Sequence, residues 1–176
     1  MDLEEIRKNI DDVDVKMREL FLKRMGLSRL VAEEKKRTNA KVYVPEREEE
    51  VISRRAKEVT ELGPEYRMFL KQVMAISRTY QYSRFDFPPA LKNLQTDAKS
   101  YTLEFTCNKG SEQLLAAVTA LKMAGIVIHE IHSKSAEEKM ICRILISGDF
   151  TLELAKGAVL QIYEENENVS VQKGEE

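Results

Sequence analysis

The chain has 176 residues, a length that suits one large domain or two small ones. Its 28 lysine and arginine residues are balanced by 30 aspartate and glutamate residues, so it lacks the basic excess with which nucleic-acid-binding proteins neutralise phosphates. The apolar runs fall short of the about 18 residues that a membrane span needs, and the acidic first residues do not resemble a secretory signal, so we expect a cytoplasmic protein with no nucleic-acid or membrane partner.

The first predicted element is a long amphipathic helix. Asp2 and Glu5 have the spacing of a capping box, and the helix is expected to run to about Lys36. Its seam positions recur at alternating steps of four and three, as in a heptad repeat, and all but one of them are apolar: Ile6, Ile10, Val13, Met17, Leu20, Arg24, Leu27 and Val31. Such a helix is about 50 Å long at 1.5 Å per residue, longer than a domain of about 80 residues is wide. We therefore expect it to pack against a second chain.

Two further helices are predicted before residue 85. The second begins at Pro45, which is followed by acidic residues that favour a helix N-terminus, and it is expected to end near Leu62. Residues 63–64 (Gly-Pro) separate it from the third helix. The apolar stripe of the third helix comprises Tyr66, Phe69, Val73, Ile76 and Tyr80. Residues 1–84 are thus predicted to form an all-α domain.

The remainder is predicted to be a linker followed by an α+β domain. Pro88 and Pro89 oppose a continued helix and favour an extended path, so residues 85–100 are expected to be the linker. From Tyr101 onward apolar residues alternate as in a half-buried strand. A helix from Ser111, strands at 126–132 and 139–147, a helix opened by Thr151 and a strand at 169–171 complete the order βαββαβ. This order predicts a ferredoxin-like domain over residues 101–176.

Charged residues interrupt the seam of the first helix. Arg24 occupies a position that should be apolar, and a buried guanidinium needs an anionic partner, either a protein side chain or a ligand. Lys35 lies eleven residues later, within about 20° of the same face. Arg7 lies about 100° away from that face, which suits the groove of a partner chain better than its own. Taken singly, each cation is better explained by surface ion pairs with the many glutamates, and it is the joint pattern that favours a ligand site.

Other polar residues complete a candidate site. Ser77 and Gln81 are four residues apart and so lie on one face of the third helix, where they offer a hydroxyl and an amide. Arg47 and Glu48 lie at the start of the second helix.

Together these residues resemble the motif set of the all-helical chorismate mutases. The matching segments, in order, are 3–11 (LEEIRKNID), 22–24 (LKR), 34–35 (EK), 47–48 (RE) and 77–81 (SRTYQ), and the resemblance covers residues 3–84. The family fold is an intertwined homodimer with two equivalent sites, each built mostly from one chain. The resemblance implies that this chain isomerises chorismate to prephenate in the shikimate pathway toward phenylalanine and tyrosine.

The resemblance also implies a role for each site residue. Arg24 and the partner subunit's Arg7 would bind the two substrate carboxylates, with Arg47 assisting and Ser77 hydrogen-bonding a carboxylate. Lys35 and Gln81 would contact the ether oxygen, and Glu48 would hold the ring hydroxyl. Val44 stands where the family often has aspartate, three residues before the Arg-Glu pair. The reaction is an intramolecular rearrangement of a dianion, so no cofactor or metal is expected.

The C-terminal domain resembles the ACT regulatory module, in which amino acids bind near the first strand-to-helix turn. Gly110 and the stretch that includes His132 and Ser133 occupy the equivalent places and are candidate effector-binding residues, with an aromatic amino acid as the possible effector. A module that serves only dimer or tetramer assembly is the alternative.

Two other functions compete with a chorismate mutase. An isochorismate pyruvate lyase would use the same scaffold and similar cations on an isomer of the substrate. A non-catalytic helical dimerisation and metabolite-sensing protein would instead fill the charged seam with its own glutamates.

The cysteines and histidines do not indicate a metal site. Cys107 and Cys142 lie in separate predicted strands, and in a reducing compartment they are expected to be free buried thiols. His129 and His132 lack nearby ligands with the spacing of a zinc site.

Overall fold

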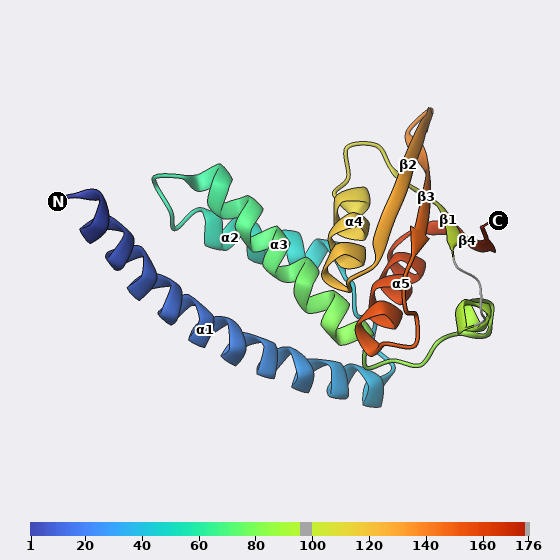
Figure 1. Cartoon of the computed structure of the whole chain (residues 1–176), viewed down its shortest axis with the longest axis horizontal. Helices are drawn as coiled ribbons and strands as arrows, with labels where there is room; N and C mark the ends of the chain where they lie inside the picture. Colours follow the sequence, from blue (N-terminus) through green and yellow to red (C-terminus); the bar gives the residue numbers. More distant parts are fainter. Residues whose placement is uncertain (96–99, 175–176) are drawn as a thin grey trace.

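The computed structural model describes residues 1–95 and 100–174. It consists of a helical region, residues 3–82, and a sheet region, residues 101–173, which pack against each other (Figure 1). The helices are α1 (Leu3–Thr38), α2 (Pro45–Ala56), α3 (Gly63–Tyr82), the 3-10 helix η1 (Pro89–Gln95), α4 (Gln113–Met123) and α5 (Glu153–Glu165). The strands are β1 (Tyr101–Asn108), β2 (Val127–Ala136), β3 (Lys139–Ser147) and β4 (Glu167–Lys173). None of the helices in these described ranges combines the length and apolar character of a membrane span.

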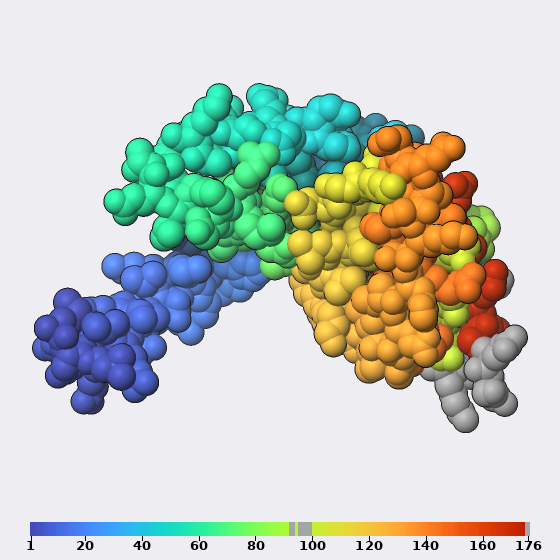
Figure 2. All heavy atoms as spheres, turned by 90° about the horizontal axis from the view of Figure 1, so that it is seen from above, coloured from blue at the N-terminus to red at the C-terminus, as the bar shows by residue number. Residues whose placement is uncertain are grey.

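Helix α1 has the length and the cap that the sequence predicts. The Asp2 carboxylate accepts from the Glu5 backbone N–H at 2.9 Å, and the Glu5 carboxylate accepts from the Asp2 N–H at 3.1 Å, which confirms the capping box. Its first part is an arm that projects away from the rest of the chain (Figures 1 and 2). Every residue from 1 to 23 is exposed, including the apolar seam, whereas the C-terminal half of α1 packs on α3.

Helix α2 ends earlier than predicted. The expectation of a helix to about Leu62 is wrong, because α2 stops at Ala56 and the chain turns tightly through residues 57–62. Further along, Leu62 adopts a left-handed conformation with φ of 56°, just ahead of Gly63 and Pro64. That geometry cannot continue an α-helix.

Helix α3 is the central element of the chain. It packs against α1 and α2 on one side and against α4 and α5 on the other. Its buried residues are therefore not the predicted apolar stripe, of which Phe69 is exposed, but residues spread around the helix: Leu70, Ala75, Ser77, Arg78, Thr79, Gln81 and Tyr82. Several of these are polar, so the C-terminal half of α3 buries hydrogen-bonding groups between the two regions.

The segment after α3 is not simply extended. Residues 89–95 form the 3-10 helix η1, since proline is favourable in a first helical turn, and Leu91 and Leu94 are buried in the hydrophobic core. The prediction of an extended path is therefore wrong for these residues. Residues 96–99 of the predicted linker lie outside the described part of the chain.

The sheet region follows the predicted order of strands and helices. Its four strands are antiparallel in the order β2-β3-β1-β4, with Phe105 of β1 opposite Cys142 of β3. Strand β1 alternates as predicted, because Tyr101, Leu103, Phe105 and Cys107 are buried and the intervening residues are partly exposed. Helices α4 and α5 contact each other and pack between the sheet and α3.

The two cysteines are free and buried, as predicted. Cys107 of β1 and Cys142 of β3 lie with their sulfurs 4.0 Å apart. Burial, together with the neighbouring Cys107, raises the pKa of the Cys142 thiol to about 12, so this thiol is unreactive at neutral pH.

Candidate active site

A polar cleft lies where α1, α2 and α3 meet. Its volume is about 210 Å³. The cleft is lined by residues of all three helices: Arg24, Ser28 and Val31 of α1, Arg47, Glu48 and Val51 of α2, and Met74, Ser77, Arg78 and Gln81 of α3. The structure thus brings together five of the predicted site residues, namely Arg24, Arg47, Glu48, Ser77 and Gln81.

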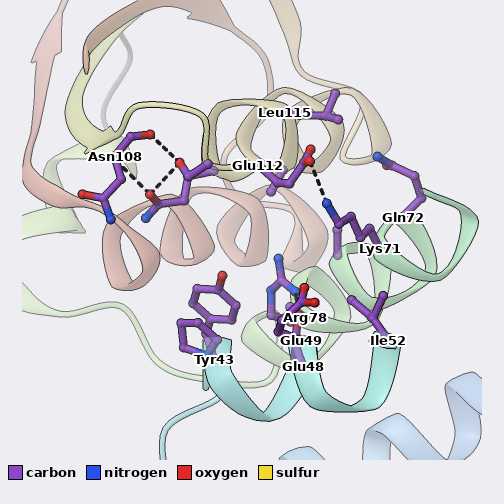
Figure 3. A pocket seen from close by; sticks show the side chains of 15 residues that line it. Tyr43, Glu48, Glu49, Ile52, Lys71, Gln72, Arg78, Asn108, Glu112 and Leu115 are labelled. Atoms are coloured by element: carbon purple, nitrogen blue, oxygen red, sulfur yellow. Dashed lines mark hydrogen bonds and ion pairs between the residues drawn. The ribbon is translucent and has the colours of Figure 1, made fainter. Parts of the chain in front are cut away.

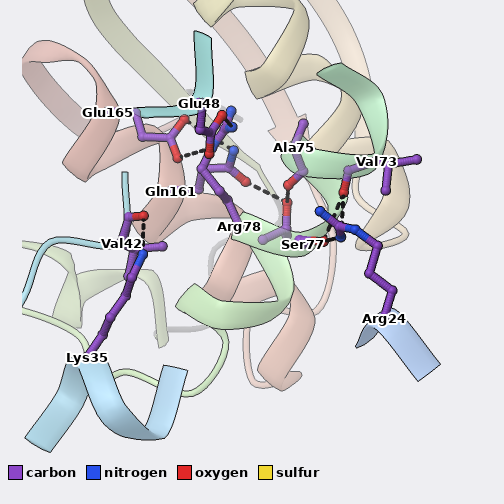
Figure 4. Close-up of polar contacts among 11 residues, drawn as sticks. Arg24, Lys35, Val42, Glu48, Val73, Ala75, Ser77, Arg78, Gln161 and Glu165 are labelled. Atoms are coloured by element: carbon purple, nitrogen blue, oxygen red, sulfur yellow. Dashed lines mark hydrogen bonds and ion pairs between the residues drawn. The ribbon is translucent and has the colours of Figure 1, made fainter. Parts of the chain in front are cut away.

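Arg24 is half-buried and its hydrogen-bond partners are neutral. One guanidinium nitrogen, Nη1, donates to the Val73 carbonyl at 3.3 Å and to the Ser77 hydroxyl (Figure 4). The Ser77 hydroxyl donates in turn to the Val73 carbonyl at 2.9 Å. Burial, and then the positive charge of Arg55, lower the pKa of Arg24. Within residues 1–95 and 100–174 no carboxylate lies within ion-pair distance of Arg24, so its charge is left to attract an anion in the cleft.

Glu48 is held from the side of α3. The Arg78 guanidinium donates from Nη1 to Glu48 Oε2 and from Nε to Glu165 Oε1, the latter at 2.7 Å. The Arg78 guanidinium also stacks over the Tyr43 ring, 4.5 Å from its centroid. Arg78 is 6% exposed, so it is a buried cation between two carboxylates. The sequence pattern alone does not single out Arg78 for a role, although this residue lies inside the SRTYQ motif.

Gln81 and Arg47 differ in exposure: the first is buried in the cleft and the second is exposed at its rim. Gln81 is buried, and its Oε1 has no hydrogen-bond partner among the described residues. This oxygen is free to accept a hydrogen bond from a ligand, because an unsatisfied buried polar group is costly, and the proposed donor to a ligand is the amide nitrogen of the same side chain. Arg47 is exposed at the rim and forms an ion pair with Glu50 at 2.8 Å.

Lys35 is close to the cleft but does not line it. Its ammonium donates to the Val42 carbonyl at 2.7 Å (Figure 4). Burial lowers the pKa of Lys35, while the negative charge of Glu48 acts in the opposite direction. That interaction places Lys35 within electrostatic range of Glu48. An ammonium carries three donors, so the bond to Val42 leaves others available.

Arg7 is not part of this cleft within its own chain. It lies on the exposed arm of α1, seventeen residues before Arg24 and so about 25 Å away along the helix axis. No arginine side chain spans that distance.

The candidate effector residues are not gathered in one place. Gly110 lies in the turn after β1 with φ of 71°, a conformation that glycine adopts readily. His132 and Ser133 lie on the exposed edge strand β2, and β3 separates them from β1. The His132 ring is 3.0 Å from the Glu130 carboxylate.

A further cavity of about 280 Å³ lies between the helical and sheet regions (Figure 3). It is lined by residues of α2, α3 and the turn between β1 and α4, and Lys71 forms an ion pair with Glu112 across it at 2.8 Å. Glu48 and Arg78 belong to the lining of both this cavity and the cleft. In the described part of the chain no three histidine, cysteine, aspartate or glutamate side chains are placed to hold a metal ion.

Comparison with known families gives one match for the helical region. The model of the chorismate mutase type II family matches residues 6–82, which include α2, α3 and all of α1 after its first turn. The matched range contains every residue that lines the cleft and none of the sheet region. No curated protein matches the chain. The match supports chorismate mutase activity for the helical region.

Proposed function

We propose that this protein is a chorismate mutase that converts chorismate to prephenate, toward phenylalanine and tyrosine. The observation that carries the proposal is Arg24: a half-buried cation, in a cleft within the range matched by the family, whose partners are neutral oxygens. A protein that used Arg24 only to hold its helices together would place a glutamate against it. The hydrogen-bond partners of Arg24 are neutral, and Glu48, the carboxylate that lines the same cleft, is paired with Arg78 instead, which favours an anionic ligand over the non-catalytic alternative.

The proposed substrate is a dianion, and the basic residues are assigned to its carboxylates. Arg24 binds one carboxylate and the partner subunit's Arg7 binds the other, because planar guanidinium groups recognise carboxylates with two parallel hydrogen bonds. Ser77, already within reach of Arg24, hydrogen-bonds a carboxylate. Arg47 at the rim assists by its charge.

The proposed chemistry needs shape and charge but no proton transfer. Two arginine forks hold the flexible side chain of the substrate over its ring, which removes conformational freedom before the bond rearrangement. Lys35 and Gln81 donate to the ether oxygen, where negative charge grows as its bond to the ring breaks. A preorganised donor of this kind lowers a barrier by about 3–4 kcal/mol. Glu48 accepts a hydrogen bond from the ring hydroxyl. Val44 stands where the family often has an aspartate, so Glu48 binds this hydroxyl without that second carboxylate.

We further propose that the active form is a dimer in which α1 of each chain reaches the other. Three observations support it: the exposed apolar seam of the arm, the distance of Arg7 from its own cleft, and the cleft volume of about 210 Å³, which is below the range of about 300–1,000 Å³ for complete small-molecule sites. A second chain would supply the missing wall.

For the sheet region we propose an ACT-like, ferredoxin-like module that regulates the enzyme or assembles it. The strand order β2-β3-β1-β4 and the two intervening helices support the ferredoxin-like plan. Addition of phenylalanine or tyrosine to the purified enzyme separates the two roles. A sensing module changes the rate, with Gly110, His132 and Ser133 as the first residues to substitute, whereas an assembly module leaves the rate unaltered.

Turnover of chorismate by the purified protein tests the main proposal. The loss of chorismate and the formation of prephenate are followed directly, and isochorismate is supplied in parallel. We expect chorismate to be isomerised and isochorismate to release pyruvate far more slowly. Faster release of pyruvate from isochorismate would establish the lyase instead, and no reaction with either substrate would leave the dimerisation protein.

A further inference from the structure

The Arg78 side chain joins the cleft to the sheet region. Its guanidinium contacts Glu48, which lines the cleft, and Glu165, at the C-terminal end of α5. Both acids are themselves shielded, with side chains 24% and 4% exposed, and the Arg78 side chain is 8% exposed. Figure 4 shows Arg78 directed from α3 toward both carboxylates.

Glu165 is fixed by contacts of its own. Its second carboxylate oxygen, Oε2, accepts from the Gln161 amide at 3.2 Å. The Gln161 carbonyl oxygen accepts from the Thr79 hydroxyl of α3, and the backbone carbonyl of Glu165 accepts from the Gln113 amide of α4. Glu165 does not line the Arg24 cleft, yet it is anchored to α3, α4 and α5.

The geometry of a guanidinium transmits this anchoring to Glu48. The nitrogens of arginine lie in one plane with fixed angles, so the bond from Nε to Glu165 sets the direction in which Nη1 points. The bond from Nη1 holds Oε2 of Glu48. Among the described residues no hydrogen bond to the other oxygen, Oε1, is present, so it is left to accept from a substrate hydroxyl.

An ion pair that served only stability would not need this arrangement. Buried ion pairs contribute little net stability, because desolvation offsets the attraction, and one carboxylate would neutralise Arg78. Here two carboxylates share one cation, which is less favourable for each acid than a separate pair. The unfavourable sharing of one cation by two acids is explained if it serves to fix the orientation of the Glu48 carboxylate.

We propose that Glu165 is a positioning residue for the substrate site: through Arg78 it fixes the carboxylate of Glu48, and the sheet region is thereby part of the active site. The inference rests on the proposed function, since Glu48 is assigned there to the ring hydroxyl. It makes Glu165 matter for substrate binding although Glu165 touches no substrate.

Steady-state kinetics of Glu165→Ala test the proposal. A lost hydrogen bond to the substrate hydroxyl weakens ground state and transition state alike, so we expect KM for chorismate to rise about tenfold, with a smaller change in kcat. Glu165→Gln, whose amide oxygen can still accept from Arg78 Nε, should restore KM to near the wild-type value. If Glu165→Ala does not fold, Glu165→Asp, which keeps the charge but is one methylene shorter, serves in its place.

The chain offers a matched control in a second ion pair between the two regions. Arg84, just after α3, pairs with Glu153 of α5 at 3.4 Å, but both are more exposed and neither contacts Glu48. Glu153→Gln should leave KM and kcat unchanged. In a Glu48→Gln background, Glu165→Ala should have no further effect on KM, because the residue through which it acts is already altered.

Two results would overturn the proposal. One is a KM for Glu165→Ala equal to that of wild type, or a fall in kcat alone, as expected from a reduced folded fraction. The other is additivity of the Glu48 and Glu165 substitutions. If the wild-type protein does not turn over chorismate, the proposed function fails, and the positioning claim is then decided by NMR. The carboxyl carbon signal of Glu48 should shift in Glu165→Ala but not in Glu153→Gln; an unmoved signal would refute it.

Discussion

The half-buried charge of Arg24 sets the chemistry of the cleft at the level of single residues. Removing a guanidinium from water is costly, and the carbonyl of Val73 and hydroxyl of Ser77 compensate for it only in part. The remaining attraction is available to an anion, and the surrounding helices keep the arginine in place before that anion arrives. The free-energy cost of orienting the Arg24 side chain is therefore incurred during folding and not when the anion binds.

Arg24→Ala should reduce turnover of chorismate by about a hundredfold or more while the fold persists, because the substitution removes charge from a ligand site. The measurement is the initial rate, together with the thermal unfolding midpoint. Arg29→Ala is the control on the same helix: Arg29 is exposed and pairs with Glu33, at 3.7 Å, so its loss should leave the rate unchanged. A wild-type rate in Arg24→Ala would contradict the assignment of the cleft.

The pKa values of Arg78 and Glu165 both reflect the placement of one cation between two acids. The pKa of Arg78 is raised, because two acids stabilise its charge against the effect of burial. The pKa of Glu165 is also raised, to about 7, because burial and the nearby Glu48 outweigh the attraction of Arg78. The charged form of Arg78 is thus favoured by both acids, whereas the charged form of Glu165 is disfavoured by the charge of Glu48.

The raised pKa of Glu165 predicts a pH-dependent stability. Its folded pKa of about 7 lies above the ordinary 4.5, so proton uptake favours the folded state. This contribution is fully present below about pH 4.5 and is lost as the pH rises through about 7. Urea unfolding of wild type from pH 4 to pH 8 should therefore show a free energy of unfolding that falls relative to Glu165→Gln. Parallel curves for the two proteins would mean that Glu165 does not titrate in this range.

The lowered pKa of Lys35 predicts a separate loss of activity at alkaline pH. Burial lowers its pKa below the ordinary 10.5, and its ammonium is proposed to stabilise the ether oxygen. The rate should therefore fall as the pH rises toward that lowered pKa, while the neutral amide of Gln81 continues to donate. In Lys35→Gln the residual rate should be lower at neutral pH and independent of pH in the alkaline range. An alkaline fall that persists in Lys35→Gln would show that another group is responsible.

The site residues differ in how far the sequence can predict them. Arg24 can be predicted from the sequence because it is a charged residue at a position where the helical repeat calls for an apolar one. Arg78 is not, because its burial depends on α3 being covered on several sides, and its partner Glu165 is 87 residues away. An arginine at position 78 does not interrupt the apolar stripe predicted for α3, so the sequence of the helix does not single it out. Only the packing of α5 on α3 gives that arginine its role.

At the level of elements, the contact between α3 and α5 depends on Gly157. A methyl group at this position would lie 2.6 Å from the Thr79 carbonyl oxygen and 2.7 Å from the Ser83 nitrogen, both in the backbone. The two helices therefore approach more closely than any other residue would allow. Glycine in a helix interior is otherwise unfavourable by about 1 kcal/mol relative to alanine, so the close approach explains its presence here.

Gly157→Ala should destabilise the protein by about 1–3 kcal/mol, because overpacking against backbone outweighs the better helix propensity. The same substitution at Gly26, inside α1 with nothing within 4 Å of the added methyl, should stabilise it by up to about 1 kcal/mol. Chemical denaturation measures both. A gain in stability for Gly157→Ala would mean that α5 does not lie this close to α3.

The elements that sequence predicts well are those whose cause is local. The capping box of Asp2 and Glu5 and the alternation along β1 are set by neighbouring residues, and both are confirmed. The end of α2 at Ala56 is not predicted, because residues 57–61 contain no proline or glycine that would stop a helix. The 3-10 helix at 89–95 was missed because the burial of Leu91 and Leu94 in the core, a tertiary contact, favours a compact path after the two prolines.

At the level of the whole molecule, the exposed arm of α1 sets the expected assembly. An apolar seam of this length is unfavourable in water unless another surface covers it. In the proposed dimer a second copy would provide the same seam, related by a two-fold axis, and would carry Arg7 to the cleft of its neighbour. Sedimentation should therefore show a dimer at micromolar concentration, and a folded monomer would count against the shared site.

Mixing two inactive variants tests the shared site directly. After exchange of subunits between Arg7→Ala and Arg24→Ala proteins, one site of each mixed dimer carries both lesions and the other carries neither. Half of the dimers are mixed, each with one intact site, so activity should recover to about a quarter of wild type. Arg24→Ala mixed with Ser77→Ala is the control: both residues line the cleft of one chain, so every site keeps a lesion and nothing is regained. No recovery in the first mixture, despite proven exchange, would refute the shared site.

The contact between Arg78 and Glu165 also constrains how such a protein can change over time. A gene that passed on the helical region alone would transmit Arg78 with Glu48 but without Glu165, so the acid that sets the direction of the guanidinium would be missing. Recombination at the junction between the regions is therefore disfavoured, although the chain there makes a natural crossover point. We expect the residues at positions 78 and 165 to be inherited as a pair, charged together or apolar together, among descendants of this sequence.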